Sequence, residues 1–206
     1  ANYRINAPVD LAAGNNFSTM LGTDGTVVQY RVITSLGVAG SISGTDLQGI
    51  NGHLVGNYVL GANIDASATV AWNDNGDGTY AGFAPIGPDA THFFAGILDG
   101  LGHTINGVFI DRPSTSGVGP FGYVGNTAEI RNIGLTSVNL TGASYVGGLV
   151  GYNNGGSISN SYATGQVAGG SVYVGGLVGV NKGSISNSYA TAMVAGNDLG
   201  TGGLAG

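Results

Sequence analysis

Short apolar runs separated by glycine and polar turns follow one another along this chain, and this pattern predicts strands. Val27-Val-Gln-Tyr-Arg-Val-Ile33 is the best strand of the first 44 residues, because it combines β-branched and aromatic residues. An Asp-Gly pair within Thr23–Thr26 precedes it and predicts a hairpin turn. Residues 45–50 predict the one helical turn, with Thr45 as its cap and Gln48 completing a capping box. The chain is therefore expected to be all-β.

Other segments before residue 119 predict further short strands and turns. Tyr3–Asn6 and Tyr58–Ile64 are strand candidates, and Gly14–Asn16 is a turn candidate. Phe94–Val108 alternates apolar residues with glycines, which predicts a strand, a bend and a second strand. Residues 65–95 are irregular, and we interpret them as an insertion.

A repeat organises the second half of the chain. Tyr145–Asn153 returns as Tyr173–Asn181 with eight of nine positions identical, and Gly156–Thr164 returns unchanged as Gly183–Thr191. A third copy begins at Thr201, and degenerate matches extend the repeat back to about Gly119. Self-similarity at a period of about 27–28 residues is typical of solenoids, in which each unit buries its core by stacking on the next.

A unit of this length without helix-forming residues predicts one coil of a parallel β-helix, with three short strands and three bends. At about 25–28 residues per coil, the chain would form roughly eight coils along an axis of ~40 Å. Gly148 and Gly176 would allow close backbone approach. Asn160 and Asn187 would stack at a bend. Strict alternation from Ile158 would place Asn160 and Tyr162 inward, whereas a change of face at the bend, which we favour, places Ser161 and Ala163 inside and Tyr162 outside. The inward candidates of two successive coils are Leu149, Ile158 and Val167, then Leu177, Ile185 and Val194.

Composition narrows the possible functions. Glycine makes up 41 of 206 residues, charged residues are 8%, and the net charge is −6. The five basic residues are scattered, so no patch exists to neutralise phosphates and nucleic acid is not expected as a partner. No apolar run approaches the ~20 residues that span a bilayer, so membrane insertion is not expected either. The absence of cysteine excludes disulfides and thiolate metal sites.

One loop resembles a calcium-binding pattern. Asn73, Asn75 and Asp77 stand at ligand spacing in Asn73-Asp-Asn-Gly-Asp-Gly78, which makes them candidate ligands for Ca²⁺. The first ligand is Asn rather than Asp, and Ala84 stands where an EF-hand needs Glu. These departures remove much of the charge that holds the ion, so an Asx-rich turn is the favoured interpretation.

Catalytic patterns are weaker still. The three histidines are isolated from one another, with His103 expected at a turn where the backbone satisfies it. Glycan-cleaving β-helices need paired carboxylates, and here only Asp99 and Asp111 are candidates to converge. The chain is therefore not expected to be an enzyme.

Two glycosylation sequons, at Asn16 and Asn139, fit a pattern that is common by chance. Four tyrosines form either a carbohydrate-stacking surface or, as we prefer, a structural ladder: Tyr152, Tyr162, Tyr173 and Tyr189.

Two resemblances follow from these residues. Tyr145–Gly151 with Ile158–Gly165 resembles the GLUG repeat of bacterial surface proteins. The upstream segments are similar to large filamentous-haemagglutinin-like exoproteins of two-partner secretion systems, through Thr45–Asn51, Gly56–Asp65, Phe83–Gly87 and Phe94–Gly107. The resemblance implies a right-handed parallel β-helix, secretion to the surface of a Gram-negative cell, and a role in adhesion or surface fibres. It implies no catalytic residues, since the motif is a packing motif.

These observations predict one β-helix domain over residues 1–206, interpreted as a fragment of a longer protein. Residues 1–118 would form irregular coils and residues 119–206 the GLUG-type repeats. The expected function is a non-enzymatic stalk or filament in adhesion or matrix assembly. Its expected partners are a host-cell or matrix receptor, a glycan, or copies of itself end to end. The alternatives are a carbohydrate-active β-helix enzyme and a calcium-stabilised glycan-binding module.

Overall fold

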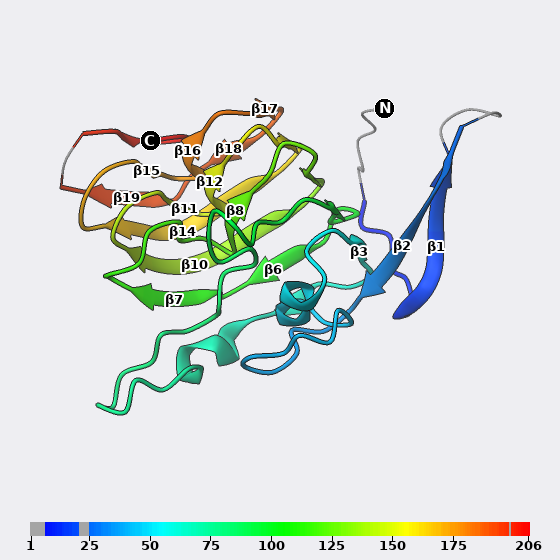
Figure 1. The fold of residues 1–206 in the computed structure, drawn as a ribbon, viewed down its shortest axis with the longest axis horizontal. Helices are drawn as coiled ribbons and strands as arrows, with labels where there is room; N and C mark the ends of the chain where they lie inside the picture. Colours follow the sequence, from blue (N-terminus) through cyan, green and yellow to red (C-terminus); the bar gives the residue numbers. More distant parts are fainter. Residues whose placement is uncertain (1–6, 21–24, 198) are drawn as a thin grey trace.

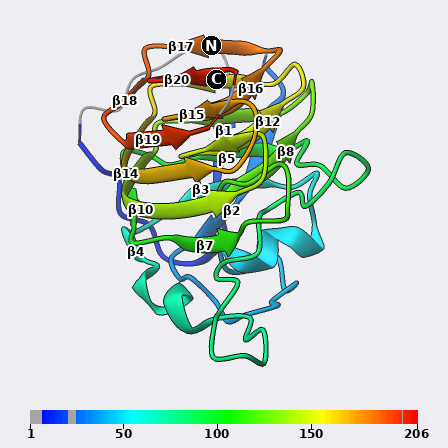
Figure 2. The same cartoon turned by 90° about the vertical axis from the view of Figure 1, so that its left-hand side faces the viewer.

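The chain folds as a parallel β-solenoid of about six turns, seen in a computed structural model that describes residues 7–20, 25–197 and 199–206. Its strands lie one above another in Figure 1, and the coils are seen from the side in Figure 2. The predicted all-β, parallel β-helical fold is confirmed. The predicted strand at Tyr3–Asn6 lies outside the described residues, as does most of the predicted turn at Thr23–Thr26.

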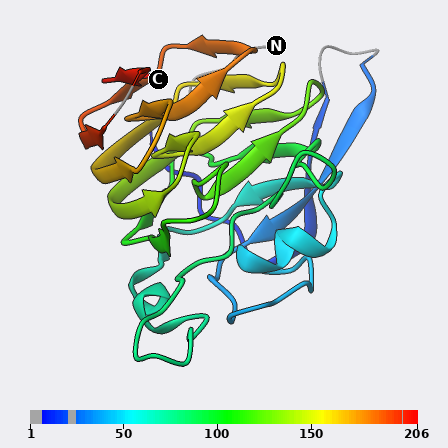
Figure 3. The ribbon, with the colours of Figure 1, turned by 60° about the vertical axis from the view of Figure 1, so that its left-hand side comes forward.

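The first sheet contains one strand from each coil. Its strands are parallel except β1, which pairs antiparallel with β2 at the edge of the sheet, and the hairpin of these two strands stands beside the stacked coils (Figure 3). Gly14–Asn16 therefore begins a strand instead of forming the predicted turn, because Gly14 pairs with Val32. The strands, in spatial order, are β1 (Gly14–Met20), β2 (Val27–Ile33), β3 (Asn57–Leu60), β5 (Ile97–Asp99), β9 (Glu129–Arg131), β13 (Ser157–Ser159) and β17 (Ser184–Ser186).

The second sheet and a third face complete each coil. In the second sheet the order is β18 (Tyr189–Ala190), β14 (Tyr162–Gly169), β10 (Gly134–Gly142), β6 (Thr104–Asn106) and β4 (Ile64–Asp65), with β19 (Met193–Gly196) on β14 and β7 (Phe109–Arg112) on β10. The third face consists of two small sheets: β11 (Val146–Gly147), β15 (Val174–Gly175) and β20 (Thr201–Gly202), then β16 (Val178–Asn181), β12 (Val150–Asn153) and β8 (Phe121–Val124).

Strand register in the first sheet shows how the length of the coils varies. Val32 pairs with Val59. In the two repeat coils, Ile130 pairs with Ile158 and Ile158 with Ile185, at nearly the same separation in sequence. Tyr58 pairs with Leu98, so the coil between β3 and β5 is the longest in the sheet. Leu98 pairs with Ile130, so the coil between β5 and β9 has an intermediate length. The chain therefore has fewer than the eight coils predicted. The terminal hairpin and the longest coil contain residues that an even division of the chain would assign to further coils.

The longest coil carries the irregular segment. A short 3-10 helix, η2 (Ser67–Ala71), leads into a loop whose arms meet at an antiparallel bridge between Asp74 and Tyr80. The segment projects from the stack in Figure 1. Solenoids accommodate such insertions in the bends between strands, so the stacked sheets continue on either side of it. The division of the chain at residue 118 stays a prediction.

The predicted helical turn begins a few residues further along the chain than expected, and side-chain hydrogen bonds other than a capping box hold it. The 3-10 helix η1 (Gln48–Gly52) begins after Leu47, with no side chain capping it. Thr45 is not the cap, because its hydroxyl donates to Ser43 Oγ at 2.8 Å. Asp46 accepts the amide of Gly49 at 2.7 Å, and the Gln48 side chain is hydrogen-bonded to the backbone of Ala84 at 3.0 Å. The capping box does not form because its polar groups have other partners.

The core is a set of apolar ladders parallel to the solenoid axis. Leu98, Ile130 and Ile158 are paired in register and fully buried. Burial of each such side chain contributes about 1.5–3 kcal/mol. Leu149 and Leu177 are fully buried at the third face. Ile185 and Val194 in the last coil are only partly buried, because no further coil covers them among the described residues.

The bend between the first and second sheets is made by asparagine. Asn132, Asn160 and Asn187 adopt left-handed backbone conformations with φ of 53°, 48° and 48°, which asparagine tolerates better than most residues. The Asn160 amide donates to Asn132 Oδ1 at 3.2 Å, which links two coils along the axis. The bend reverses the facing of the next residues, so Ser161 is buried and Tyr162 is not. The predicted change of face at Asn160 is confirmed.

Substitution of Asn160 tests this bend. We expect Asn160→Ala to lower the free energy of unfolding by about 2 kcal/mol, because alanine is strained at positive φ and loses the bond to Asn132. Asn160→Gly removes the same side chain without the strain and should lower it by about 1 kcal/mol. Urea unfolding followed by circular dichroism measures both, and equal losses for the two variants would contradict the argument from backbone strain.

Candidate functional site

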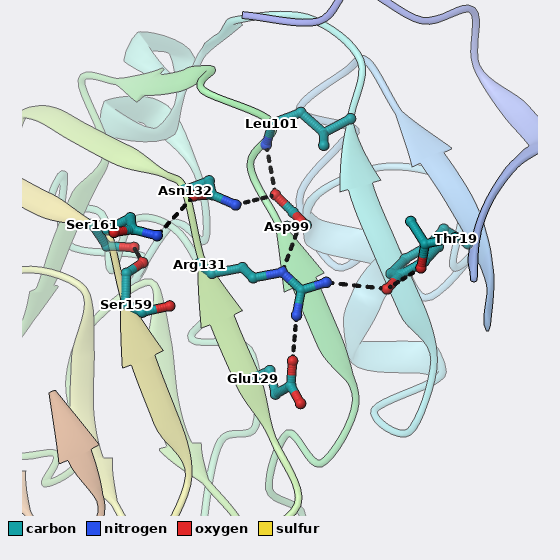
Figure 4. A network of polar contacts seen from close by, with 10 residues as sticks. Thr19, Asp99, Leu101, Glu129, Arg131, Asn132, Ser159 and Ser161 are labelled. Atoms are coloured by element: carbon teal, nitrogen blue, oxygen red, sulfur yellow. Dashed lines mark hydrogen bonds and ion pairs between the residues drawn. The ribbon is translucent and has the colours of Figure 1, made fainter. Parts of the chain in front are cut away.

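A buried polar network lies on the outer side of the first sheet. Asp99 follows the inward-facing Leu98 in β5, so alternation directs it away from the core. Its side chain is fully buried and accepts three hydrogen bonds: from Arg131 Nε at 2.8 Å, from Asn132 Nδ2 at 3.0 Å and from the Leu101 amide at 2.9 Å. Figure 4 shows these donors gathered around the one carboxylate.

Arg131 extends the network to the terminal hairpin. It forms a second ion pair with Glu129, and its Nη2 donates to the hydroxyl of Tyr30 at 3.2 Å. The Tyr30 hydroxyl in turn accepts from Thr19 at 3.3 Å (Figure 4). Strands β2, β5 and β9 are therefore joined through one guanidinium, and β1 is joined to them through the Tyr30 hydroxyl. This network attaches the hairpin to the solenoid and presents no carboxylate to solvent at Asp99.

The two carboxylates that were candidates for glycan cleavage do not form an open pair. Asp99 belongs to the first sheet, and Asp111 lies on β7, which pairs with β10 of the second sheet. Asp99 is fully buried and engaged by Arg131. A general acid must reach the glycosidic oxygen, so Asp99 cannot act on a chain bound from solvent.

The candidate calcium loop closes on its own hydrogen bonds. Asn73 Nδ2 donates to the Gly82 carbonyl at 2.6 Å, and Asn75 Nδ2 donates to Thr79 Oγ1 at 2.9 Å. Asp77 accepts from the Thr79 hydroxyl at 2.6 Å and from its amide at 2.9 Å, and these bonds lower the pKa of Asp77. No group of three or more His, Cys, Asp or Glu side chains converges as a metal site within the described ranges.

Calcium binding by this loop stays a prediction, and its test is direct. We expect the same melting temperature in millimolar Ca²⁺ and in excess chelator, because the loop has Asn73 and Ala84 where an EF-hand places Asp and Glu, and these departures remove much of the charge that holds the ion. Calcium that binds the folded state would raise the melting temperature by mass action. Such a rise, abolished by Asp77→Asn, would establish the calcium-stabilised alternative.

The histidines have different surroundings. His103 is buried, with Nε2 3.0 Å from the Val9 carbonyl and Nδ1 3.3 Å from Asn63 Oδ1. The prediction that the backbone satisfies His103 is confirmed. His92 is exposed and pairs with Asp89 at 3.0 Å. The sequon asparagines, Asn16 and Asn139, are both exposed on strands.

The four tyrosines singled out from the sequence lie on two faces instead of one. Tyr162 and Tyr189 stack on the second sheet, with ring centroids 5.1 Å apart and planes within 4°. Beside them, the asparagine bend forms a shallow groove of about 470 Å³. Tyr152 and Tyr173 lie on the third face, where different partners surround them. The predicted structural ladder is confirmed for the first pair.

A larger aromatic cluster occupies the third face. Tyr152 stacks on Tyr123 at 5.7 Å and meets Tyr145 edge-on at 5.4 Å, and Tyr145 lies 5.9 Å from Tyr173. Lys182 Nζ is 5.3 Å from the Tyr152 ring centroid. Burial, then the neighbouring Tyr145, raises the pKa of Tyr123. Tyr123 and Tyr145 were not predicted as members of an aromatic cluster, although Tyr123 pairs with Tyr152 at a spacing close to the repeat period.

Comparisons with known proteins agree with the repeat. The family model described as the GLUG motif matches residues 142–168 and 170–194. Halomucin of Haloquadratum walsbyi is 38% identical over 125 residues, which is 59% of this chain and 1% of halomucin. A protein of Evansella cellulosilytica, named as a candidate Gly-rich membrane protein, is 41% identical over 82 residues, or 38% of this chain and 9% of that protein. The chain thus spans a small part of the curated relatives it matches.

A solved structure has the same fold. The crystal structure of a candidate immunoglobulin A1 protease from Bacteroides ovatus superposes with a TM-score of 0.57 at 19% identity, covering 84% of this chain and 55% of that one. At this identity the likeness concerns the fold alone. The relatives by sequence are surface-type or membrane-associated by name, which fits a surface protein. No helix in the described segments is long and apolar enough to cross a membrane.

Proposed function

We propose that this chain is a non-enzymatic, stiff segment of a secreted surface protein, acting as a stalk in adhesion or matrix assembly. The observation that carries the proposal is the continuous core: the strands of the first sheet pair in parallel register from β2 to β17, and one inward ladder runs from Tyr58 through Leu98 to Ile185. A solenoid with one uninterrupted core has no joint at which coils can hinge. The GLUG match and the likeness to a small part of halomucin support a repeated structural role.

The surface location is tested on intact producing cells. Antibodies against the purified chain are expected to label unpermeabilised cells, and external protease should remove the label. Labelling that appears only after permeabilisation would contradict a surface role. The Gram-negative origin and the two-partner secretion route stay predictions.

The enzymatic alternative is tested separately. We expect no release of reducing ends or unsaturated products from a panel of polysaccharides, because Asp99 is buried and lies on a different sheet from Asp111. Product formation that disappears in Asp111→Asn would overturn the non-enzymatic proposal. Asp111→Asn is the informative variant, because it leaves the buried network around Asp99 intact.

End-to-end association is a second candidate, favoured by the last coil. Met193 is 71% exposed and Leu199 is 83% exposed there, next to strand edges that no further coil covers in the part of the chain that the structure describes. We propose that copies meet through the coil that carries Met193 and Leu199. Sedimentation velocity should show a concentration-dependent dimer that Met193→Glu weakens. A monomer at millimolar concentration would count against it.

A further inference from the structure

A hollow of about 320 Å³ opens on the third face, where the segment before β5 meets the repeats. Phe93 contributes one wall, and Tyr123, Tyr145 and Tyr152 contribute the others, with Asn154 at the rim. These residues come from three coils, so the hollow exists only in the stacked solenoid. Its volume lies at the lower end of the range for small-molecule sites, about 300–1,000 Å³.

The wall from the irregular segment is held in place. Phe94 is fully buried, its amide donates to the Tyr123 carbonyl at 2.9 Å, and its ring lies 5.1 Å from Phe121. The preceding Phe93 is 40% exposed. Asp89 accepts the amides of Thr91 and His92, each at 2.8 Å, which fixes the turn before it. The aromatic wall is thus formed before any ligand arrives.

The wall from the repeats has an unusual backbone at Tyr145. Its φ is 56°, a conformation that costs a bulky residue strain and that glycine adopts freely, and Tyr173, the equivalent residue one coil later and outside the lining of the hollow, has a φ of 62°. Core packing does not require these rings, since Tyr145 is only half-buried and Tyr173 is 42% exposed. The geometry therefore places aromatic rings at the surface at a position where glycine would be less strained.

We propose that this hollow binds one neutral pyranose unit of a glycan. Aromatic rings offer faces to the C–H groups of a sugar ring, and the tyrosine hydroxyls and the Asn154 amide offer hydrogen bonds to its hydroxyls. The residues that line the hollow include no Asp, Glu, Lys, Arg or His, so it offers no charge partner to an ionic ligand, which favours a neutral one.

This inference deepens the proposed surface role and rests on it, because it names the class of ligand that such a segment would contact. Its test is binding in vitro, which does not depend on the location of the protein or on its stiffness. Methyl β-D-galactopyranoside and N-acetylglucosamine serve as neutral probes, with choline and glucuronic acid as charged comparators. Saturation-transfer NMR with the whole chain measures binding, and melting temperature monitors the fold of each variant.

We expect millimolar binding of a neutral probe, weakened about tenfold or more by Phe93→Ala and by Tyr152→Ala. Tyr189→Ala is the matched control, because it removes a stacked tyrosine from the other ladder and should leave binding unchanged. Phe93 is an exposed loop residue, so Phe93→Ala should leave the fold intact. It therefore tests binding even if Tyr152→Ala unfolds the chain. Absence of binding by both neutral probes, preference for choline or glucuronic acid, or loss of binding only in Tyr189→Ala would overturn the proposal.

Discussion

Gly148→Ala is expected to lower the free energy of unfolding by about 3 kcal/mol. A Cβ at Gly148 would lie 2.3 Å from the Gly176 carbonyl oxygen and 2.7 Å from the Ala163 Cβ. The first contact is with the backbone of the next coil, so relief requires the coils to separate. Urea denaturation followed by circular dichroism measures the loss.

The repeat supplies matched controls for this prediction. Gly176 occupies the same motif position one coil later, and an added Cβ there would lie 2.2 Å from the Gly203 carbonyl oxygen. Gly176→Ala should therefore lower the free energy of unfolding by a similar amount. Gly203 is the third copy, and a Cβ there meets nothing within 4 Å. We expect Gly203→Ala to leave stability unchanged or to raise it by up to about 1 kcal/mol. Equal losses at all three positions would show that glycine is needed for reasons other than coil packing.

Arg131→Met is expected to lower the free energy of unfolding by about 3–5 kcal/mol, the largest effect that we predict for a single substitution. It leaves the fully buried Asp99 carboxylate without its ion-pair partner. It also removes the bond to Tyr30 that holds the terminal hairpin. Hydrogen exchange should therefore show loss of protection in β1 and β2 before the rest of the sheet.

Glu129→Gln is the control for that experiment. Glu129 pairs with the same arginine but is 47% exposed, so solvent screens the interaction. We expect a change of less than about 1 kcal/mol. A loss at Glu129 as large as that at Arg131 would mean that the exposed ion pair, and not the buried one, stabilises the hairpin.

The repeat carried most of the fold information in the sequence. Because Leu149 and Ile158 recur at the same spacing in the next copy, stacking alone predicts that they face inward. Asn160 recurs too, and its tolerance of positive φ predicts the bend that turns Tyr162 outward. In each case the local residue type and the period lead to the same conclusion, which is why these features could be predicted.

The features that escaped prediction depend on residues far apart in the chain. Asp99 and Arg131 pair across two coils in a stretch where the coil length departs from the repeat, so no period connects them. Tyr30 reaches Arg131 from a strand near the start of the chain. The number of coils was overestimated for the same reason, since only the register reveals the longest coil. The hollow on the third face likewise combines Phe93 from irregular sequence with Tyr145 from the repeat.

The central claim is that each repeat is one coil stacked in parallel register on the next. Nuclear Overhauser contacts in solution test it most directly. We predict contacts from the Ile158 methyl groups to those of Ile130 and Ile185, and between the rings of Tyr162 and Tyr189. Absence of these contacts, with Ile158 instead close to residues of a neighbouring antiparallel hairpin, would contradict the solenoid and every surface derived from it.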